Sequence, residues 1–359
     1  MSSFLPVPLR RHTMVGVDIG ASSVKVVEIS VARGGRALTL HRCASELLEK
    51  GAVVNGSLVQ VDAVARALTS ALRKGRIHSH AATLALPLSL TECSTLSLPD
   101  NLSHDELGVE VEHEAQRLYP PSEQINYDHG IIAHHREAKS VTVQVVAARR
   151  DAVEERVFAA ELAGLKPVAI EVEETSIHRL MASRARAASN GHAHAGIEVL
   201  VHLGATRSAA LFYQGAMPVH REQINSTGDQ LTESCARAFR QDMRKAEIHK
   251  RKNTLPREWR AQILKPSLEL LAMEIQSAIS SFAARSTLGA VERILLCGGH
   301  ASLPGLDEAV QAQSRIATEI FDPFAHMTIG RHVNPRYFER DLPAQVIGAG
   351  LGLRGGAQP

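Results

Sequence analysis

Residues 15–29 constrain this chain more than any other segment. Apolar residues alternate up to Ile19, and a β-branched run resumes at Val24. Between them lies a short turn of small residues, Gly20-Ala21-Ser22-Ser23. Alternation on both sides of a glycine-containing turn is typical of a β-hairpin. The chain is therefore predicted to begin a sheet with a tight hairpin.

The same pattern returns in the middle of the chain. Residues 199–206 repeat the pattern of residues 15–22, from a β-branched run into a Gly-Ala turn. Self-similarity at a fixed offset indicates internal duplication. It predicts two like lobes that each open with a strand–turn–strand unit. Chance similarity of two common turns stays open as the alternative.

Composition fits a globular protein of two or three domains. The 359 residues are 44% hydrophobic and 22% charged, which excludes a disordered chain. The formal net charge of +2 gives no basic footprint for nucleic acid. Aromatic residues are scarce (one Trp, four Tyr and eight Phe), which disfavours stacking platforms for bases or sugars. The 18 histidines are interpreted mostly as surface residues.

Several features predict a soluble cytoplasmic protein. The four cysteines are scattered without a C-x-x-C pair, which favours a reducing compartment. The first eleven residues contain two prolines and no continuous apolar stretch, unlike a signal peptide. No run of about 18 apolar residues is long enough to cross a membrane.

Between the two hairpin patterns the pattern of predicted helices and strands changes. Residues 89–149 contain an acidic helix at 106–118 and strands at 125–133 and 140–147, as in a small α+β module. The segment 188–196 is small and polar and forms the best candidate linker. Its His192-x-His194 lacks a third metal ligand nearby. Helices are also predicted at 57–74, 229–250 and 267–283, the last of them before a strand that enters Gly298-Gly299.

Hairpin tips that face each other across a cleft suit a polyphosphate. Backbone N–H groups in small-residue turns form anion-binding concavities. Ser22 and Ser23 add hydroxyl donors, and Lys25 adds a positive charge. Asp18 suits a Mg²⁺ ion held through bound water.

These residues resemble the actin-like ATPase superfamily. The resemblance is carried by Asp18-Ile19-Gly20 with Ser22-Ser23-Val24-Lys25, by Leu203-Gly204-Ala205-Thr206 and by Gly298-Gly299. Within the superfamily the chain is similar to the PilM family of type IV pilus assembly proteins. Further segments of that similarity are Val146-Ala147-Ala148-Arg149, Ala163-Gly164-Leu165-Lys166-Pro167, Arg221-Glu222-Gln223 and Asp322-Pro323-Phe324-Ala325-His326-Met327. The similarity runs from about residue 14 to residue 354 in the same order and spacing.

The resemblance implies an α/β, actin-like two-lobed ATPase fold with duplicated lobes and an FtsA-type α+β subdomain inserted in the first lobe. The first lobe would comprise residues 13–88 and 151–190, interrupted by the inserted subdomain at 89–150. The second lobe would comprise residues 196–354, with a helical subdomain at about 226–290.

The resemblance also implies ATP and Mg²⁺ in the cleft between the lobes. Asp18 would hold the metal through water, and Glu173 would position the attacking water. Glu247 and Lys250 would meet ribose or adenine, with a solvated helix face as the alternative. The remaining implied contacts belong to the two phosphate motifs and the adenosine motif: Asp18, Gly20, Ser22, Ser23 and Lys25; Gly204, Ala205 and Thr206; Gly298, Gly299 and His300.

The chain departs from the family at a position that matters for hydrolysis. His202 stands where the second phosphate motif of the family has an aspartate. Smaller departures are Thr227-Gly228 in place of Gly-Gly, and Tyr119-Pro120-Pro121 in the inserted subdomain. Because phosphoryl transfer depends on positioning of metal and nucleophile, the chain is expected to bind ATP with weak or absent ATPase activity.

The implied function is a cytoplasmic ATP-binding scaffold at the inner-membrane face of the type IV pilus platform. Its expected partner is the N-terminal cytoplasmic peptide of PilN, held between the first lobe and the inserted subdomain. Pilus motor ATPases, other platform proteins and self-association are further expectations, without nucleic acid and without direct membrane insertion.

Three alternatives remain at this stage. The first is a catalytically active ATPase or small-molecule kinase of the same superfamily. The second is an FtsA-like filament former with a membrane-targeting tail, which the glycine-rich residues 351–359 disfavour. The third is the cytoplasmic part of a type II secretion membrane protein, which would carry a transmembrane span.

Overall fold

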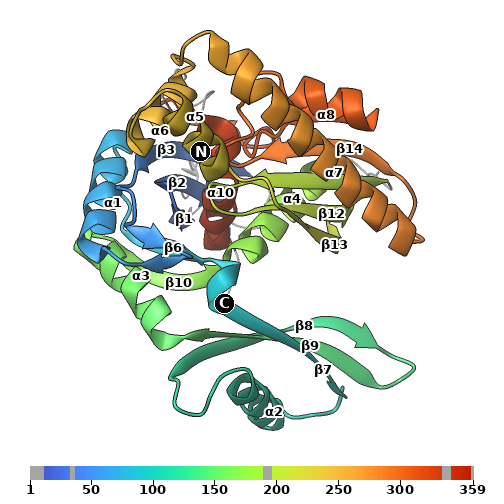
Figure 1. Ribbon diagram of the computed structural model, residues 1–359. Helices are drawn as coiled ribbons and strands as arrows, with labels where there is room; N and C mark the ends of the chain where they lie inside the picture. The colour runs from blue at the N-terminus through green and yellow to red at the C-terminus, as the bar shows by residue number, and fades with distance from the viewer. Residues whose placement is uncertain (1–11, 33–36, 189–195, 334–340, 357–359) are drawn as a thin grey trace, which may run out of the picture.

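The two predicted hairpins begin two separate β-sheets. We analysed a computed structural model of the chain, which describes residues 12–32, 37–188, 196–333 and 341–356. The first hairpin pairs β1 (His12–Ile19) with β2 (Ser23–Val31), and the second pairs β11 (Ile197–Leu203) with β12 (Ser208–Gln214). Both hairpins therefore form as the sequence predicts (Figure 1).

Five strands of each sheet follow the same order. The order β10-β6-β1-β2-β3 in the first sheet corresponds to β15-β14-β11-β12-β13 in the second, and β16 extends the first sheet beyond β3. In each, the first three strands along the chain are antiparallel neighbours, and two later strands join in parallel beside the first. The duplication predicted from residues 15–22 and 199–206 is thus present in the topology. The remaining strands are β3 (Leu38–Leu47), β6 (Ala81–Leu86), β10 (Lys166–Val172), β16 (Thr328–Ile329), β13 (Met217–Ile224), β14 (Val291–Cys297) and β15 (Ala317–Ile320).

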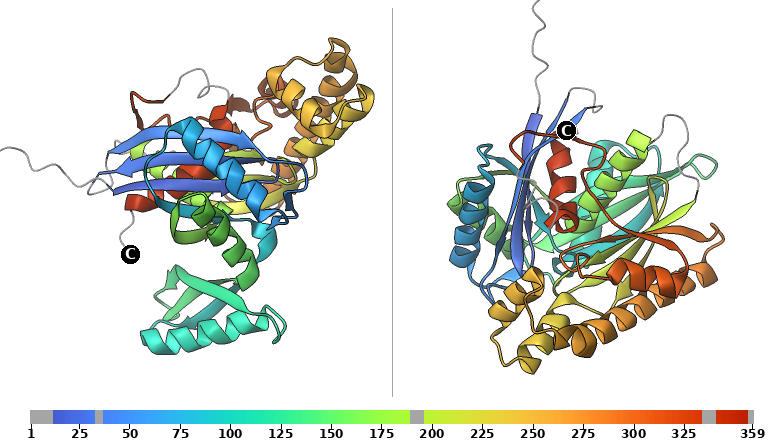
Figure 2. Two further views of the ribbon diagram at one scale, coloured as in Figure 1. Left: turned by 90° about the vertical axis from the view of Figure 1, so that its left-hand side faces the viewer. Right: turned by 90° about the horizontal axis from the view of Figure 1, so that it is seen from above.

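Helices cover both sheets and separate them. α1 (Val61–Gly75) and α3 (Arg150–Leu162) pack on the outer face of the first sheet. α4 (Glu173–Ala188) and α10 (Val346–Gly352) lie between the sheets, as the right panel of Figure 2 shows for the red α10. The outer face of the second sheet is covered by α5 (Gly228–Ala238), α6 (Met243–Lys252), α7 (Lys265–Arg285) and α8 (Leu306–Ser314).

The alternation of β2 explains how one strand serves two cores. Val24 and Val26 face the outer core with α1, whereas Val27, Ile29 and Val31 face the layer between the sheets. All five side chains are buried. A strand whose two faces are both covered carries apolar residues at nearly every position, as β2 does.

The structure corrects two helix predictions. The predicted helix at 57–74 begins only at Val61, because Ser57–Leu58 forms the short strand β5 against β4 (Val53–Val54). The predicted helix at 229–250 is divided into α5 and α6. Asp242 caps the second helix by accepting a hydrogen bond from the Lys245 N–H at 2.9 Å. Such N-caps favour a new helix start.

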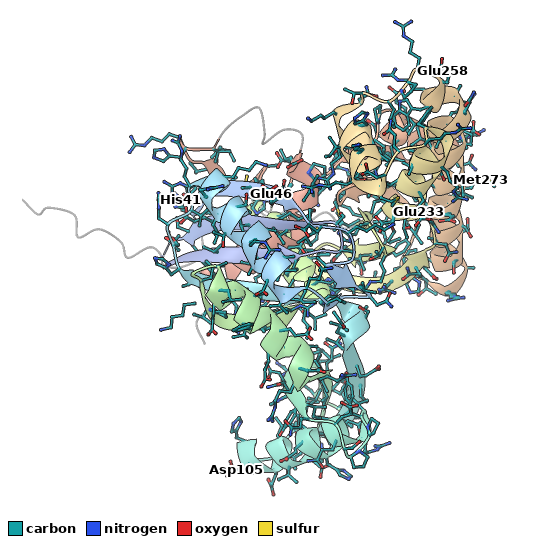
Figure 3. All side chains as sticks on the ribbon, turned by 60° about the vertical axis from the view of Figure 1, so that its left-hand side comes forward. His41, Glu46, Asp105, Glu233, Glu258 and Met273 are labelled. Carbon is teal, nitrogen blue, oxygen red and sulfur yellow. The ribbon has the colours of Figure 1, made fainter. Side chains whose placement is uncertain are left out.

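The inserted region forms a separate sheet with its own core. β7 (Thr91–Pro99), β9 (Ser140–Arg149) and β8 (Ile125–His135) pair in the order β7-β9-β8. α2 (His104–Arg117) covers one face, where alternate residues of β9 from Val141 to Ala147 are buried. The short helix η1 (Leu88–Leu90) and α3 join this module to the first sheet. Figure 3 labels Asp105 on α2 and Glu258 beyond α6 at opposite ends of the molecule.

The C-terminal helix α10 belongs spatially to the first sheet, although the proposed second lobe contains it. A Cβ on Gly16 of β1 would lie 2.0 Å from the Gly348 carbonyl oxygen. A Cβ on Gly350 would lie 2.0 Å from the Ser176 carbonyl oxygen of α4. Glycine at these two positions allows the backbones of β1, α10 and α4 to touch. We retain the four domain ranges given above as a proposal.

Within the described ranges, the longest apolar helices all fall short of what a membrane crossing requires. The predicted linker histidines 192 and 194 lie outside the described residues.

The contact between β1 and α10 generates a stability prediction. Gly16→Ala is expected to lower the free energy of unfolding by about 2–3 kcal/mol, because the added methyl group must displace backbone atoms. Gly108→Ala is the control, since a Cβ there meets nothing within 4 Å on the exposed α2. That change should stabilise the protein by up to about 1 kcal/mol. Urea denaturation of both variants measures the difference, and equal stability would contradict the packing.

Candidate nucleotide-binding site

A cavity of about 320 Å³ lies where the two sheets meet. Its walls come from the turn after β1, the turn after β11 and the turn after β14. These turns contain Gly20, Gly204 and Gly298, respectively. Because β1, β11 and β14 end at this cavity, the strand order of both sheets brings the predicted motifs together.

The first turn holds an ion pair next to its glycine. Lys25 and Asp18 are direct cross-strand partners, and Lys25 Nζ lies 3.0 Å from Asp18 Oδ2. The Gly20 N–H donates to the Ser23 carbonyl oxygen at 3.1 Å and closes the turn. A Cβ on Gly20 would lie 3.0 Å from Lys25 Nζ. The turn therefore presents a cation to the cavity, with a buried carboxylate beside it.

The second turn is tied to the start of α5. The Gly204 N–H donates to the Arg207 carbonyl oxygen at 3.0 Å, and a Cβ on Gly204 would lie 2.3 Å from that oxygen. The N–H groups of Gly228 and Asp229 donate to the carbonyl oxygens of Gly204 and Ala205. The first residues of α5 are thus hydrogen-bonded directly to the turn of the second predicted phosphate motif.

The third turn packs on the end of β11. Gly298 has φ of +93°, and a Cβ there would lie 2.4 Å from the Leu203 carbonyl oxygen. A left-handed residue in such close contact must be glycine. At Gly299 the nearest atom to a Cβ is 3.9 Å away, on Arg251. The backbone at Gly299 is therefore open toward the cavity.

All predicted site residues except Glu247 and Lys250 line this cavity. From the first half of the chain the cavity receives Asp18, Gly20, Ser22, Ser23, Lys25 and Glu173. From the second half it receives His202, Gly204, Ala205, Thr206, Gly298, Gly299 and His300. Their roles toward a ligand remain predictions.

Glu247 and Lys250 form a buried cluster behind the cavity wall. Lys250 Nζ lies 2.5 Å from Glu247 Oε2, 2.5 Å from Thr232 Oγ1 and 2.7 Å from His300 Nε2. Although burial acts in the opposite direction, Lys250 and Arg251 hold the pKa of Glu247 well below its usual range. Burial lowers the pKa of Lys250. The cluster links α6, α5 and the third turn.

His300 is the member of this cluster that reaches the cavity. Burial, and then Lys250, lower its pKa well below the usual value, so the ring is neutral. Because the Lys250 ammonium donates to Nε2, the ring proton is assigned to Nδ1. Within the described residues, Nδ1 is buried without a hydrogen-bond partner. It is therefore a donor available to a bound ligand.

His202 occupies the wall beside Asp18 and Lys25. Burial lowers its pKa to about 4, while Asp18 acts in the opposite direction and Lys25 in the same one. The imidazole is neutral at neutral pH. It neither repels a cation nor supplies the negative charge that the family's aspartate would bring.

Glu173 is paired with an arginine that the sequence analysis did not single out. Arg207 Nη2 lies 3.2 Å from Glu173 Oε1, and the Leu88 N–H donates to the same oxygen at 3.4 Å. Burial raises the pKa of Glu173, against the opposing effect of Arg207. One carboxylate oxygen, Oε1, is thus engaged by protein donors, while the side chain still lines the cavity.

Four charged residues in the lining were missed by sequence reasoning. They are Glu174, Arg207, Arg221 and Arg251. Arg207 directly follows the Gly204–Thr206 motif, so its place in the sequence could have identified it as a residue of the site. Arg221 and Glu174 are 47 residues apart and pair at 2.7 Å only in the folded chain.

The residues present fit the predicted Mg²⁺ ion poorly, because the phosphate motifs supply a single carboxylate. Mg²⁺ is bound through one or two carboxylates together with phosphate and water. Asp18 is the one carboxylate that the phosphate motifs retain, and it is already paired with Lys25. His202 replaces the second carboxylate. In the described part of the chain, His, Cys, Asp and Glu side chains do not gather in threes as a protein-built metal centre requires.

The low pKa of His202 predicts how stability depends on pH. The unfolded chain binds a proton near pH 6.5 and the native site does not, so acidification favours unfolding until about pH 4. Lowering the pH from about 7 to about 5 should therefore reduce the free energy of unfolding by about 2 kcal/mol through this residue. His202→Asn should lose that much less stability over this range. Urea titrations at both pH values measure the loss, and the exposed His113→Asn is the control. Equal losses in wild type and His202→Asn would contradict the lowered pKa of the native ring.

Comparison with solved structures places this site in a known fold. The chain is similar to a structure described as a PilM–PilN type IV pilus biogenesis complex, with 24% identity, a TM-score of 0.78, and coverage of 96% of this chain and 99% of the other. It also resembles the ethanolamine utilization protein EutJ from Carboxydothermus hydrogenoformans, with 15% identity, a TM-score of 0.53, and coverage of 97% and 91%. These likenesses confirm the actin-like two-lobed fold.

The family comparison covers nearly the whole chain. The family model described as "Type IV pilus assembly protein PilM" matches residues 16–356. That range includes the first hairpin from residue 16 onward, the whole second hairpin, the inserted module and α10. The chain therefore belongs to the PilM family of type IV pilus assembly proteins.

Proposed function

We propose that this chain is a nucleotide-binding scaffold of the type IV pilus assembly platform. It acts at the cytoplasmic face of the inner membrane and binds the N-terminal peptide of PilN. The observation that carries this proposal is the cavity in which three glycine turns from both sheets converge. Membership of the PilM family supplies the biological setting.

The cavity suits ATP in its size, its donors and its open backbone. Its volume lies at the lower end of the about 300–1,000 Å³ typical of ligand pockets. Lys25, Ser22 and Ser23 would bind phosphate from one side, and the turn of Gly204, Ala205 and Thr206 from the other. Gly299 and the His300 Nδ1–H would face the nucleoside, with Glu247 and Lys250 behind them.

Hydrolysis is proposed to be slow or absent. A bound triphosphate supplies the cleavable phosphoanhydride, and the protein must supply a positioned nucleophile. Glu173, the expected residue for that task, accepts hydrogen bonds from Arg207 and from the Leu88 N–H. His202 leaves the second motif without its carboxylate. The site therefore favours retention of the nucleotide over turnover.

The inserted module offers an open sheet face for the PilN peptide. Its strand register places Cys93, Thr95, Gln144 and Val146 on the face opposite α2. Apart from the half-buried Val146, these side chains are exposed. The helix α3, which joins the module to the first sheet, exposes Phe158 and Leu162 one turn apart. Extended peptides are commonly recognised at β-sheets, with their side chains held by neighbouring residues of the domain.

Motor ATPases and other platform proteins remain proposed partners, as does self-association. The alternative function is a catalytically active ATPase or small-molecule kinase. It would require Glu173 or another carboxylate to act as a base on water or on a substrate hydroxyl. The pairing of Glu173 with Arg207 disfavours this alternative.

Steady-state phosphate release separates the two functions. The purified protein with Mg²⁺ and ATP should turn over far more slowly than the about 1–10³ s⁻¹ typical of enzymes. Asp18→Ala should release phosphate no faster than the buffer without protein, which is close to the wild-type rate. Turnover within the enzymatic range that Asp18→Ala abolishes would reject the scaffold proposal in favour of the ATPase.

Peptide binding tests the partner. A labelled peptide of the first residues of PilN should bind the full chain, and Gln144→Trp should weaken it at least about tenfold by covering the open face. The matched control is Gln116→Trp, which adds the same bulk on the exposed surface of α2, across the module. Fluorescence anisotropy with and without ATP gives both affinities. Equal weakening by the two variants would place the peptide elsewhere.

A further inference from the structure

The lining of the cavity is richer in cations than the phosphate motifs alone suggest. Four basic side chains line it: Lys25, Arg207, Arg221 and Arg251. Three carboxylates line it: Asp18, Glu173 and Glu174. Four positive and three negative charges leave a formal excess of one positive charge. His202 adds no negative charge in any protonation state, whereas the family's aspartate at this position would cancel the excess.

Arg207 has the best placement among these cations. It closes the turn of the second predicted phosphate motif, since its carbonyl oxygen accepts a hydrogen bond from the Gly204 N–H at 3.0 Å. Its backbone is thereby held next to Ala205 and Thr206. Its side chain is 37% exposed and reaches Glu173 through Nη2 at 3.2 Å. A guanidinium group carries five N–H donors in a planar fork, so this contact leaves most of them for an anion.

Lys25 provides a second positive charge, from the other sheet. Its ammonium group is paired with Asp18, which neutralises the carboxylate of the first phosphate motif. Lys25 belongs to β2 of the first sheet, and Arg207 follows β11 of the second. The two cations thus approach the cavity from different sheets.

We propose that Arg207 is a phosphate-binding arginine and that it makes nucleotide binding by this chain independent of a divalent cation. The ligand class is the free anion of a nucleoside di- or triphosphate. This inference rests on the proposed nucleotide-binding function and replaces the metal-centred site expected from the sequence.

The reason is charge compensation. A metal-dependent site supplies carboxylates that organise Mg²⁺, and the ion then neutralises the phosphates. Here His202 replaces one of those carboxylates, and Arg207 closes the turn that follows it. Arginine binds phosphate through two parallel charge-assisted hydrogen bonds, which lysine does not reproduce. Positive charge on the protein therefore takes over the neutralising task of the metal.

Binding of a fluorescent ATP analogue to the full chain tests this inference, with unlabelled ATP as competitor. Wild type is measured with Mg²⁺ and with EDTA, and the two dissociation constants should agree within about threefold. Arg207→Gln should weaken binding in EDTA at least about tenfold, and Arg207→Lys should fall between the two. Arg237→Gln is the matched control, because Arg237 is an exposed arginine of the same half of the chain, outside the lining.

A double variant gives the reciprocal test. His202→Asp combined with Arg207→Gln restores the carboxylate and removes the arginine, so its ATP binding should become tighter in Mg²⁺ than in EDTA. Thermal melts without ligand confirm that each variant is folded.

The outcomes are distinguishable. Loss of wild-type binding in EDTA, with binding kept in Mg²⁺, overturns this inference and leaves the proposed nucleotide function intact. Unchanged binding by Arg207→Gln also overturns it. Absence of binding in both buffers rejects the proposed function and this inference together.

Discussion

The apolar layer between the two sheets is the contact on which the rest of the structure depends. α4 and α10 fill this layer, and buried side chains from β2, β11 and β14 close it from both sides. α10 enters because Gly16 and Gly350 let three backbones touch. Since the layer holds the two sheets together, the turns after β1, β11 and β14 meet at one cavity. No single turn could form that cavity alone.

Charge pairing is the second principle of the site. Each carboxylate in the lining has a basic partner: Asp18 with Lys25, Glu173 with Arg207 and Glu174 with Arg221. The last two pairs join the two halves of the chain. The pairs hold Lys25, Arg207 and Arg221 in place at the cavity. Each guanidinium group keeps further N–H donors for a phosphate.

The same region connects the cavity to the inserted module. Glu173 accepts a hydrogen bond from the Leu88 N–H, next to the strand that leads into the module. Arg156 of α3 is fully buried and donates to the carbonyl oxygens of Ala85, Ala152 and Gly56. Burial lowers the pKa of Arg156 only to about 10, so it stays charged. The exit helix of the module is thus bonded to a turn that lines the cavity.

The sequence by itself determined the hairpins, the duplication and the residue types of the three turns. These features are local, because alternation, small residues and a repeat are set by neighbours along the chain. The break between α5 and α6 escaped prediction, since apolar periodicity continues across it while Asp242 starts a new helix. Only the tertiary structure decided the rest. It placed α10 beside β1, buried Lys250 against His300, and brought Arg207 to Glu173. Those contacts join residues 34 to 332 positions apart, and their partners are chosen by burial and charge across the fold, which spacing along the chain does not encode.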